Sequence, residues 1–196
     1  MKNVSIVFAR KNIAIVFARA PRLGTVKRRL ARDIGDRAAL RFHTATLVRL
    51  LRDLTKQRRF QTILALTPNG AKDRLPVRVQ RIGQTSENIG QRMEAACRRY
   101  RRANVAIVGS DIPAANAAGL IAAFRALGCH DAVFGPAEDG GFWLVAMGAR
   151  RPARPFANAR WSTEHALADT LRNFTGFRVA RLRTLRDVDN ACDLPP

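Results

Sequence analysis

A basic loop follows the apolar run at residues 12–19, and it contains residue types that bind phosphate. The loop reads Arg-Ala-Pro-Arg-Leu-Gly-Thr-Val-Lys-Arg-Arg over residues 19–29. Gly24 allows a tight turn, and a helix expected from Val26 would point free N–H groups at the loop. With Lys27 nearby, these groups could cradle a phosphate. The Gly-x-x-x-x-Gly-Lys pattern of a P-loop is absent, and an ordinary loop with surface arginines is the alternative.

Carboxylates follow two other apolar runs. Asp111 comes directly after the run at residues 104–109, and a carboxylate there could hold Mg²⁺ or Mn²⁺ together with phosphate oxygens. Asp187 and Asp189 follow the last apolar run and would lie on the same side of an extended segment, where they could complete that metal site. The alternatives are a helix N-cap made by Ser110 or Asp111 and a polar turn near the C-terminus.

A glycine-rich segment, Gly-Pro-Ala-Glu-Asp-Gly-Gly-Phe-Trp-Leu at residues 135–144, lies between two apolar runs. Asp139 and Gly140 form a dipeptide that favours a hairpin turn. Gly140 and Gly141 also allow a ligand to approach the backbone closely. The segment therefore predicts either a plain hairpin or part of a binding site.

Together, the four motifs predict a ligand more specifically than any one of them does. A basic loop and strand-end carboxylates suit a metal-bound nucleoside diphosphate or triphosphate, because the metal neutralises charge on the phosphates. Lys27, Arg19 and Arg22 would add fixed positive charge. No Ser-His-Asp or Cys-His arrangement competes with this interpretation.

The elements that must position these motifs are strands alternating with helices. Apolar runs predict strands at residues 12–19, 60–67, 77–82, 104–109, 131–135, 141–147 and 177–182. Helical periodicity predicts helices at residues 26–34, 37–57, 87–102, 115–127 and 164–174. This alternation indicates an α/β domain with a mostly parallel sheet. Ligands of such sheets bind outside the carboxyl ends of the strands, where the motifs fall.

The sequence Ile-Val-Phe-Ala-Arg occurs twice, at residues 6–10 and 15–19. Only the second copy leads into a loop with Pro, Gly and Lys, so it is the copy that can build a phosphate site. We predict that residues 1–11 are an N-terminal extension outside the site. Residues 12–196 are then a single domain.

Composition excludes several classes of protein. The 196 residues are 47% hydrophobic and 26% charged, as in an ordinary globular domain. No apolar run approaches the roughly 18 residues of a membrane span, and no signal peptide is evident. The odd, widely spaced cysteines, Cys97, Cys129 and Cys192, suit reduced thiols in the cytoplasm. The three histidines lack a zinc-ligand spacing.

The formal charge of +20 comes almost entirely from arginines spread along the whole chain. A basic surface can bind nucleic acid by releasing counterions. Nucleic-acid modules, however, usually combine clustered charge with a recognisable motif, and none is present. A solvated arginine-rich surface is the simpler interpretation, and nucleic acid is not an expected partner. The charge would still attract an anionic substrate.

Several segments of the chain match the motifs of a known superfamily. The chain resembles the glycosyltransferase-A-like superfamily of nucleotide-diphospho-sugar transferases over residues 12–194. Within it, the chain is similar to a bacterial family labelled radical-SAM/selenodomain-associated transferases. The matching segments are residues 17–30, 90–93, 109–113, 135–142, 161–163, 187–189 and 193–194. The resemblance implies a three-layer α/β/α sandwich with a mostly parallel, mixed, Rossmann-like sheet.

The resemblance also implies roles for individual residues. Nucleotide-binding roles fall to Arg19, Ala20, Pro21, Arg22, Gly24, Lys27, Arg29, Gly90 and Arg92. Acceptor-binding roles fall to Asp139, Gly140, Gly141 and Trp161. Mg²⁺ or Mn²⁺ would bind Asp111 and Asp189, and the catalytic residues would be Lys27, Asp111 and Asp139.

The chain departs from the family pattern at several positions. Leu23 replaces a usual proline, Arg28 a small hydroxyl residue and Asn88 a common acidic residue. The Asp-x-Asp signature of glycosyltransferases is absent at Asp111, which favours the nucleotidyltransferase-like use of one strand-end aspartate with a distant second one.

We therefore expect a metal-dependent glycosyl- or nucleotidyltransferase. Its expected partners are a nucleotide donor (a nucleoside diphospho-sugar or a nucleoside triphosphate), an acceptor of unknown identity and, as a homodimer, a second copy of the chain. The alternative is a non-catalytic protein on the same fold that binds a nucleotide, a polyanion or nucleic acid. Arg28 and Asn88 are the residues that favour binding without turnover.

Overall fold

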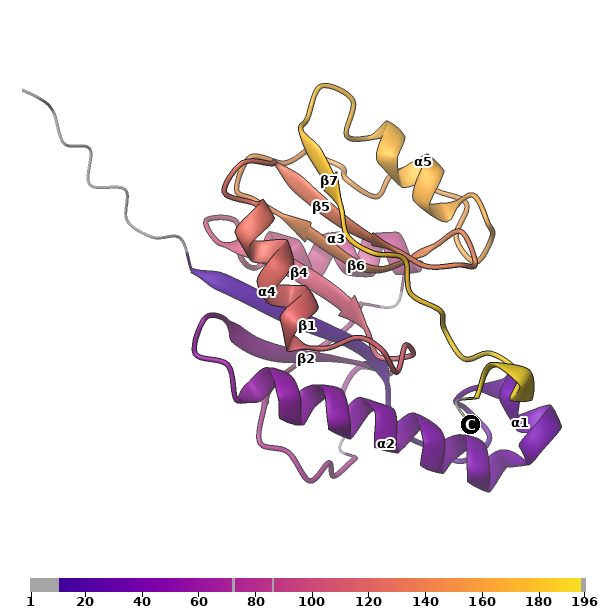
Figure 1. Ribbon diagram of the computed structural model, residues 1–196. Coiled ribbons are helices and arrows are strands. Elements are labelled where there is room, and N and C mark those ends of the chain that lie inside the picture. The colour runs from indigo at the N-terminus through magenta and orange to yellow at the C-terminus, as the bar shows by residue number, and fades with distance from the viewer. Residues whose placement is uncertain (1–10, 72, 86, 195–196) are drawn as a thin grey trace, which may run out of the picture.

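A seven-stranded sheet runs through the centre of the computed structural model, which describes residues 11–71, 73–85 and 87–194 (Figure 1). The strands are β1 (Asn12–Arg19), β2 (Gln61–Thr67), β3 (Gln80–Gly83), β4 (Asn104–Gly109), β5 (Ala132–Pro136), β6 (Phe142–Met147) and β7 (Val179–Arg181). Their order is β3-β2-β1-β4-β6-β5-β7. β6 is antiparallel to β4 and β5, whereas the other neighbouring pairs are parallel. The predicted mixed, mostly parallel sheet is confirmed.

Helices cover both faces of the sheet. They are α1 (Arg28–Ile34), α2 (Asp36–Thr55), α3 (Ile89–Arg98), α4 (Ala117–Ala126) and α5 (Ala166–Arg172), with a short 3₁₀ turn at Ala191–Asp193. Residues of α2 and α4 belong to one hydrophobic cluster, and residues of α3 and α5 pack in another on the opposite face. The fold is therefore the three-layer α/β/α sandwich that the resemblance implies.

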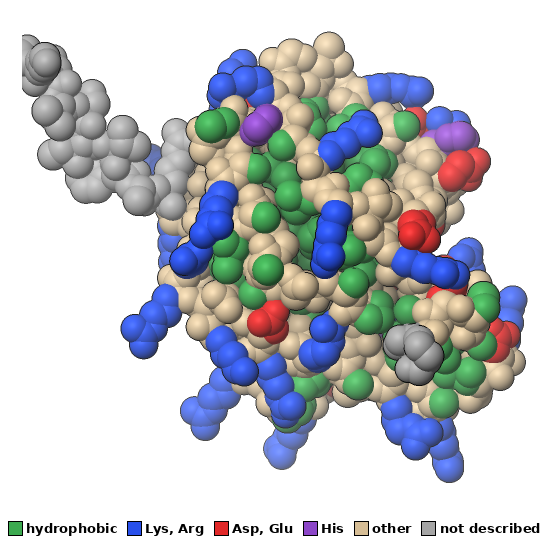
Figure 2. Space-filling model, viewed as in Figure 1, with side chains coloured by type: hydrophobic (Ala, Val, Ile, Leu, Met, Phe, Trp, Pro, Cys, Tyr) green, Lys and Arg blue, Asp and Glu red, His purple; other side chains and the backbone are tan. Residues whose placement is uncertain are grey.

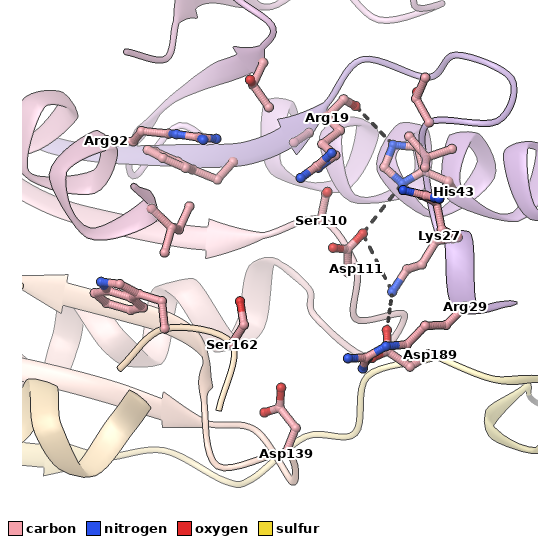
Figure 3. A pocket seen from close by; sticks show the side chains of 18 of the residues that line it. Arg19, Lys27, Arg29, His43, Arg92, Ser110, Asp111, Asp139, Ser162 and Asp189 are labelled. Atoms are coloured by element: carbon pink, nitrogen blue, oxygen red, sulfur yellow. Dashed lines mark hydrogen bonds and ion pairs between the residues drawn. The ribbon is translucent and has the colours of Figure 1, made fainter. Parts of the chain in front are cut away.

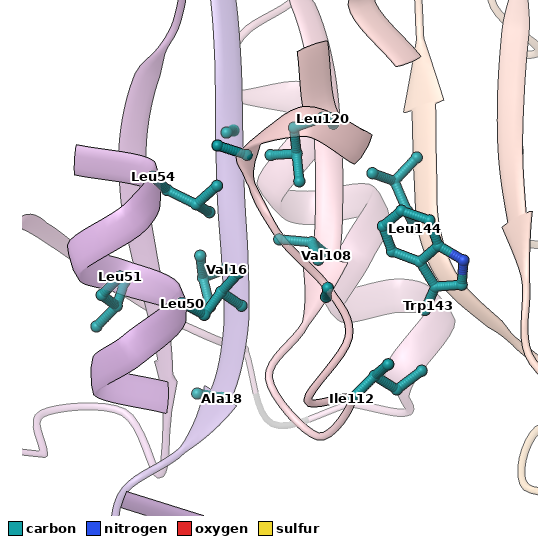
Figure 4. Close-up of a cluster of buried hydrophobic side chains, with 14 of the residues drawn as sticks. Val16, Ala18, Leu50, Leu51, Leu54, Val108, Ile112, Leu120, Trp143 and Leu144 are labelled. Carbon is teal, nitrogen blue, oxygen red and sulfur yellow. The ribbon is translucent and has the colours of Figure 1, made fainter. Parts of the chain in front are cut away.

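The central strands are buried on both faces, which explains their continuous apolar sequences. In β1, Val16 packs with Leu50 and Leu54 of α2, as Figure 4 shows. Its neighbours Ile15 and Phe17 point to the other face and join the cluster under α3. Side chains alternate between the faces of a strand, so every position in this run must be apolar.

The same topology collects the motifs at one edge of the sheet. β1 and β4 are parallel, with Phe17 opposite Gly109, so the segments that follow them leave side by side. The turn between β5 and β6 lies at the same edge, because it follows the carboxyl end of β5, and Leu185 bridges Ala137 beside it. Four segments that are distant in sequence are thereby brought together.

Most predicted elements agree with the observed ones, and the differences are local. β1 and β4 have the predicted bounds. Helix α3 starts at Ile89 because Asn88 caps it, and β3 starts only at Gln80. The first Ile-Val-Phe-Ala-Arg copy, at residues 6–10, lies outside the described residues. In the part of the chain that is described, no helix combines the length and apolarity that crossing a membrane requires.

The segment before α5 is held by a buried carboxylate. Asp169 accepts hydrogen bonds from the backbone N–H and the guanidinium of Arg160, and from the guanidinium of Arg172. The hydrogen bonds from Arg160 hold the pKa of the Asp169 carboxyl well below its usual range. This contact anchors the chain directly before Trp161.

We expect the Asp169→Asn variant to unfold more easily at neutral pH. A carboxyl whose pKa is lowered by folding stabilises the protein above its unfolded pKa of about 4, and this contribution is lost as the pH falls through the folded pKa. The difference in unfolding free energy between wild type and variant should therefore shrink below about pH 4, as denaturant titrations at several pH values would show. Glu164→Gln, at an exposed carboxylate of the same segment, is the control. A constant difference across pH would contradict the role of the charge.

Candidate functional site

A cleft of about 950 Å³ opens where the strand ends meet. Its walls come from the end of β1, the start of α1, α2, the segment after β4, the β5–β6 turn and residues 161–164 and 189 (Figure 3). Ligand sites commonly have volumes of about 300–1,000 Å³, so a nucleotide with its phosphates would fit. The cleft is where the α/β architecture predicts a ligand.

Lys27 is the central cation of the cleft. Its Nζ lies 3.8 Å from Oδ1 of Asp111 and 3.5 Å from Oδ1 of Asp189, and its side chain is only 7% exposed. Arg29 adds a second contact to Asp189 at 2.8 Å. The backbone of Lys27 adopts a left-handed conformation with φ of 47°. For a residue other than glycine, such a conformation costs about 1–3 kcal/mol and is concentrated at functional sites.

His43 supports this cluster from α2, although the motifs did not identify it. Its ring is buried, with Nε2 3.1 Å from the carbonyl oxygen of Arg19 and Nδ1 3.6 Å from Oδ1 of Asp111. A carbonyl oxygen only accepts hydrogen bonds, so Nε2 carries a proton. His43 therefore lies between the end of β1 and the carboxylate that follows β4.

Asp111 is an ionised carboxylate in an electropositive setting. Partial loss of water contact at the cleft wall favours its neutral form, yet the contact with His43 and the charges of Lys27 and Arg19 together lower the pKa of Asp111. The alternative that Ser110 or Asp111 caps a helix is wrong: α4 begins at Ala117, and Asn116 provides the cap by accepting from the N–H of Gly119. Asp111 is thus free to contact a ligand.

Asp111 and Asp189 could hold a divalent metal only together with a ligand. Mg²⁺ is often bound by one or two carboxylates plus substrate phosphates, and these two carboxylates fit that pattern. Among the described residues, no group of three or more His, Cys, Asp or Glu side chains could enclose a metal. The ammonium of Lys27 also occupies the space between the two carboxylates. A metal at this position would have to displace it.

Asp139 and Trp161 also line the cleft. Asp139 lies in the turn between antiparallel β5 and β6 and accepts a hydrogen bond from the N–H of Gly141 at 2.9 Å. The predicted hairpin turn is confirmed, and the same carboxylate still faces the cleft in Figure 3.

The predicted residues divide into two groups. Those that line the cleft are Arg19, Lys27, Arg29, Arg92, Asp111, Asp139, Trp161 and Asp189. Those that do not line it are Ala20, Pro21, Arg22, Gly24, Gly90, Gly140 and Gly141, although Gly141 lines an adjoining hollow. Arg22 instead forms an ion pair with Asp73.

Two glycines of the second group have packing roles. A Cβ atom at Gly90 would lie 2.7 Å from the ring of Trp161, and one at Gly140 would lie 2.2 Å from the carbonyl oxygen of Glu164. Both glycines therefore let the walls of the cleft approach each other closely.

Comparisons with known proteins agree with this architecture. A family model described as "Uncharacterized protein conserved in bacteria (DUF2064)" matches residues 50–163. A candidate nucleotide-diphospho-sugar transferase from Desulfovibrio desulfuricans G20 has a TM-score of 0.86 and 23% identity, covering 93% of this chain and 84% of that one. No match is found among proteins of curated function.

More distant structures have the same fold. The inositol-1-phosphate CTP transferase from T. maritima has a TM-score of 0.62 and 13% identity, covering 95% of this chain and 93% of that one. Rv0371c from Mycobacterium tuberculosis H37Rv, in a complex with manganese, has a TM-score of 0.55 and 17% identity, with coverages of 93% and 95%. These likenesses confirm the expected nucleotide-diphospho-sugar transferase-like fold.

Proposed function

The chain belongs to the bacterial DUF2064 family, and from that premise we propose that it is a metal-dependent transferase with a nucleotide-activated donor. The observation that carries the proposal is the contact of buried Lys27 with Asp111 and Asp189 inside a cleft large enough for a nucleotide. The proteins of similar fold include a candidate sugar-nucleotide transferase and a CTP transferase, which supports the same chemistry.

The side chains suggest a division of roles. Lys27 and Arg29 would bind the donor phosphates, and Arg19 would add positive charge from the end of β1. Asp111 and Asp189 would hold Mg²⁺ or Mn²⁺, which neutralises the charge that develops on the leaving phosphate. The manganese complex of Rv0371c supports this choice of ion. Asp139, in the β5–β6 turn, would accept the proton of the acceptor.

The charge of the surface agrees better with a small anionic donor than with a polyanion. On the face shown in Figure 2, Lys and Arg side chains stand apart from one another and do not form a continuous band. Inside the cleft, in contrast, the basic residues converge: Arg19, Lys27, Arg28, Arg29 and Arg92 all line it. An ion of nucleotide size is the ligand that this arrangement favours.

A thermal-shift screen of nucleoside diphosphates, triphosphates and diphospho-sugars, each with and without Mn²⁺, would test the proposal. We expect at least one nucleotide to raise the melting temperature, and Mn²⁺ to increase that shift, because a ligand stabilises the state that binds it. Product analysis then separates the two versions: nucleotidyl transfer releases pyrophosphate, and glycosyl transfer releases a nucleoside diphosphate. A screen in which no nucleotide stabilises the protein would refute the proposal.

A further inference from the structure

A second hollow of about 370 Å³ adjoins the cleft and shares part of its wall. The shared residues include Asp111, Asp139 and Trp161. Beyond them, the hollow extends between the start of α3 and the β5–β6 hairpin, where Met93, Phe142, Trp143 and Asp187 contribute to its lining. Its volume is sufficient for a small molecule.

The two spaces differ in their charged side chains: basic and acidic residues both line the main cleft, whereas the charged residues described in the second hollow are all acidic. Five Lys and Arg residues line the main cleft, whereas none of the described residues lining the second hollow is Lys or Arg. This is notable in a chain that has 35 Lys and Arg residues against 15 Asp and Glu. The hollow instead contains the carboxylates of Asp139 and Asp187, together with that of Asp111, whose charge Lys27 offsets from the main cleft.

The rest of the lining is mostly apolar and includes aromatic rings, with Ser162 and Thr163 as its hydroxyl residues. Trp161 and Phe142 pack edge to face, with ring centroids 6.1 Å apart. Trp143 donates its indole N–H to the carbonyl oxygen of Arg183, so it has no free donor to offer a ligand. A molecule in this hollow would meet apolar surface on one side and carboxylate oxygens on the other.

We propose that this hollow binds the acceptor, and that the acceptor is a hydroxyl-bearing molecule without phosphate or carboxylate groups. The inference rests on the proposed transferase function and names its second substrate. Each nearby carboxylate would weaken the binding of a phosphate several-fold even at the dielectric constant of water. A hydroxyl group, in contrast, can donate a hydrogen bond to Asp139 or Asp187.

Transfer of a sugar to such a hydroxyl group requires no reactant other than the donor and the acceptor. The acceptor oxygen forms a bond to the sugar carbon of a nucleoside diphospho-sugar in the main cleft. The bond from that carbon to the phosphate oxygen breaks, and its electron pair leaves with the nucleoside diphosphate. The hydroxyl proton passes to the carboxylate of Asp139 and then to solvent. The acceptor class thus favours the glycosyl version over transfer to a phosphate.

Tryptophan fluorescence offers a direct test, because both tryptophans of the chain line the hollow. The full chain would be titrated with the methyl glycosides of glucose, mannose and galactose, and separately with the matching sugar 1-phosphates, so that the ligands of a pair differ mainly in the phosphate. We expect at least one glycoside to change the fluorescence and to bind about tenfold or more tightly than its 1-phosphate, a difference of about 1.4 kcal/mol. Equal or tighter binding of the 1-phosphates would overturn the inference. So would the absence of a response to every glycoside.

Two matched variants separate the effect of a carboxylate inside the hollow from the effect of one that does not line it. Asp187→Asn removes a carboxylate inside the hollow. It should therefore strengthen the binding of the 1-phosphate and narrow the difference in affinity between the glycoside and its 1-phosphate. Glu138→Gln is the control, because Glu138 faces Arg186 and does not line the hollow. If both variants shift 1-phosphate binding equally, the hollow is not what selects the acceptor, and the inference is wrong.

Failure of this inference can be distinguished from failure of the proposed function. Nucleotide binding is read by melting temperature, and occupation of the hollow by the fluorescence of Trp143 in a Trp161→Phe variant, because Trp161 also lines the main cleft. If nucleotides stabilise the protein while sugar 1-phosphates fill the hollow, only the acceptor class is wrong. If no nucleotide stabilises it, the proposed transferase function is wrong, and so is an acceptor assignment that depends on it.

Discussion

The Lys27→Met variant should bind nucleotide about tenfold to hundredfold more weakly, because it loses a charge-assisted contact worth roughly 1.5–3 kcal/mol. The same variant should bind Mn²⁺ more tightly when no nucleotide is present. In the wild type, the ammonium of Lys27 lies between Asp111 and Asp189 and neutralises both. Methionine is unbranched and of similar length to lysine, so it fills the same space. It lacks the ammonium charge that competes with the metal for the two carboxylates. One substitution therefore has opposite effects on the two ligands.

Calorimetric titration with the nucleotide, and electron paramagnetic resonance of Mn²⁺ without it, would measure the two affinities. Arg32→Met is the matched control, since Arg32 is exposed in the last turn of α1 and does not line the cleft. Lysine and methionine are both unbranched at Cβ, so the left-handed backbone at this position gains no new strain from the substitution. If nucleotide affinity were unchanged, or if both affinities fell together, the assignment of Lys27 to the donor phosphates would be incorrect.

The strand-end motifs were predictable because two physical rules apply to them. A short, fully apolar run such as residues 104–109 indicates a strand buried on both faces, and β4 has these bounds. The carboxyl ends of strands in an α/β sheet carry the ligand site, so Asp111 could be assigned to the site from its position alone. The structure places it within 4 Å of Lys27, more than eighty residues away in sequence.

His43 could not be found by the same reasoning. It lies on the buried face of α2, four residues before Leu47 and eight before Leu51. At that spacing, helical periodicity predicts a residue of the hydrophobic core. The one available signal was a polar ring on an apolar stripe. Its two contacts, to the carbonyl of Arg19 and to Asp111, depend on how α2 crosses the end of β1, which no local pattern specifies.

The acceptor side was only partly predictable for a related reason. The Asp139–Gly140 turn was expected from its dipeptide, but the insertion of antiparallel β6 between β4 and β5 is a property of the whole sheet. That strand order brings Trp143 and Phe142 into the second hollow beside Asp139. Asn88 illustrates the opposite case: its departure from the family pattern coincides with a local role, as the cap of α3 that accepts from the N–H of Gln91.

The Asp111→Asn variant should lose the Mn²⁺-dependent part of nucleotide binding, and any turnover should fall by about a hundredfold or more, since a metal contributes several kcal/mol to transition-state stabilisation. Asparagine keeps the shape of the side chain but removes its charge. The lowered pKa of Asp111 means that the wild-type carboxylate is already ionised at neutral pH, so no proton must leave before a cation binds. His43 and Lys27 contact this carboxylate without adding a second negative charge beside it.

Asp139→Asn is the comparison that makes this result specific. Asp139 lines the same cleft, yet it lies in the β5–β6 turn, and the ion pairs of the described residues join Lys27 to Asp111 and Asp189 and not to Asp139 (Figure 3). We expect Asp139→Asn to reduce turnover while the thermal shift caused by nucleotide still increases with Mn²⁺, because the carboxylate that accepts the proton is not the one that holds the metal. In Asp111→Asn, the increase with Mn²⁺ should disappear. If Asp111→Asn kept this increase with Mn²⁺ and Asp139→Asn lost it, the metal would be bound by Asp139. The roles of the two aspartates would then have to be exchanged.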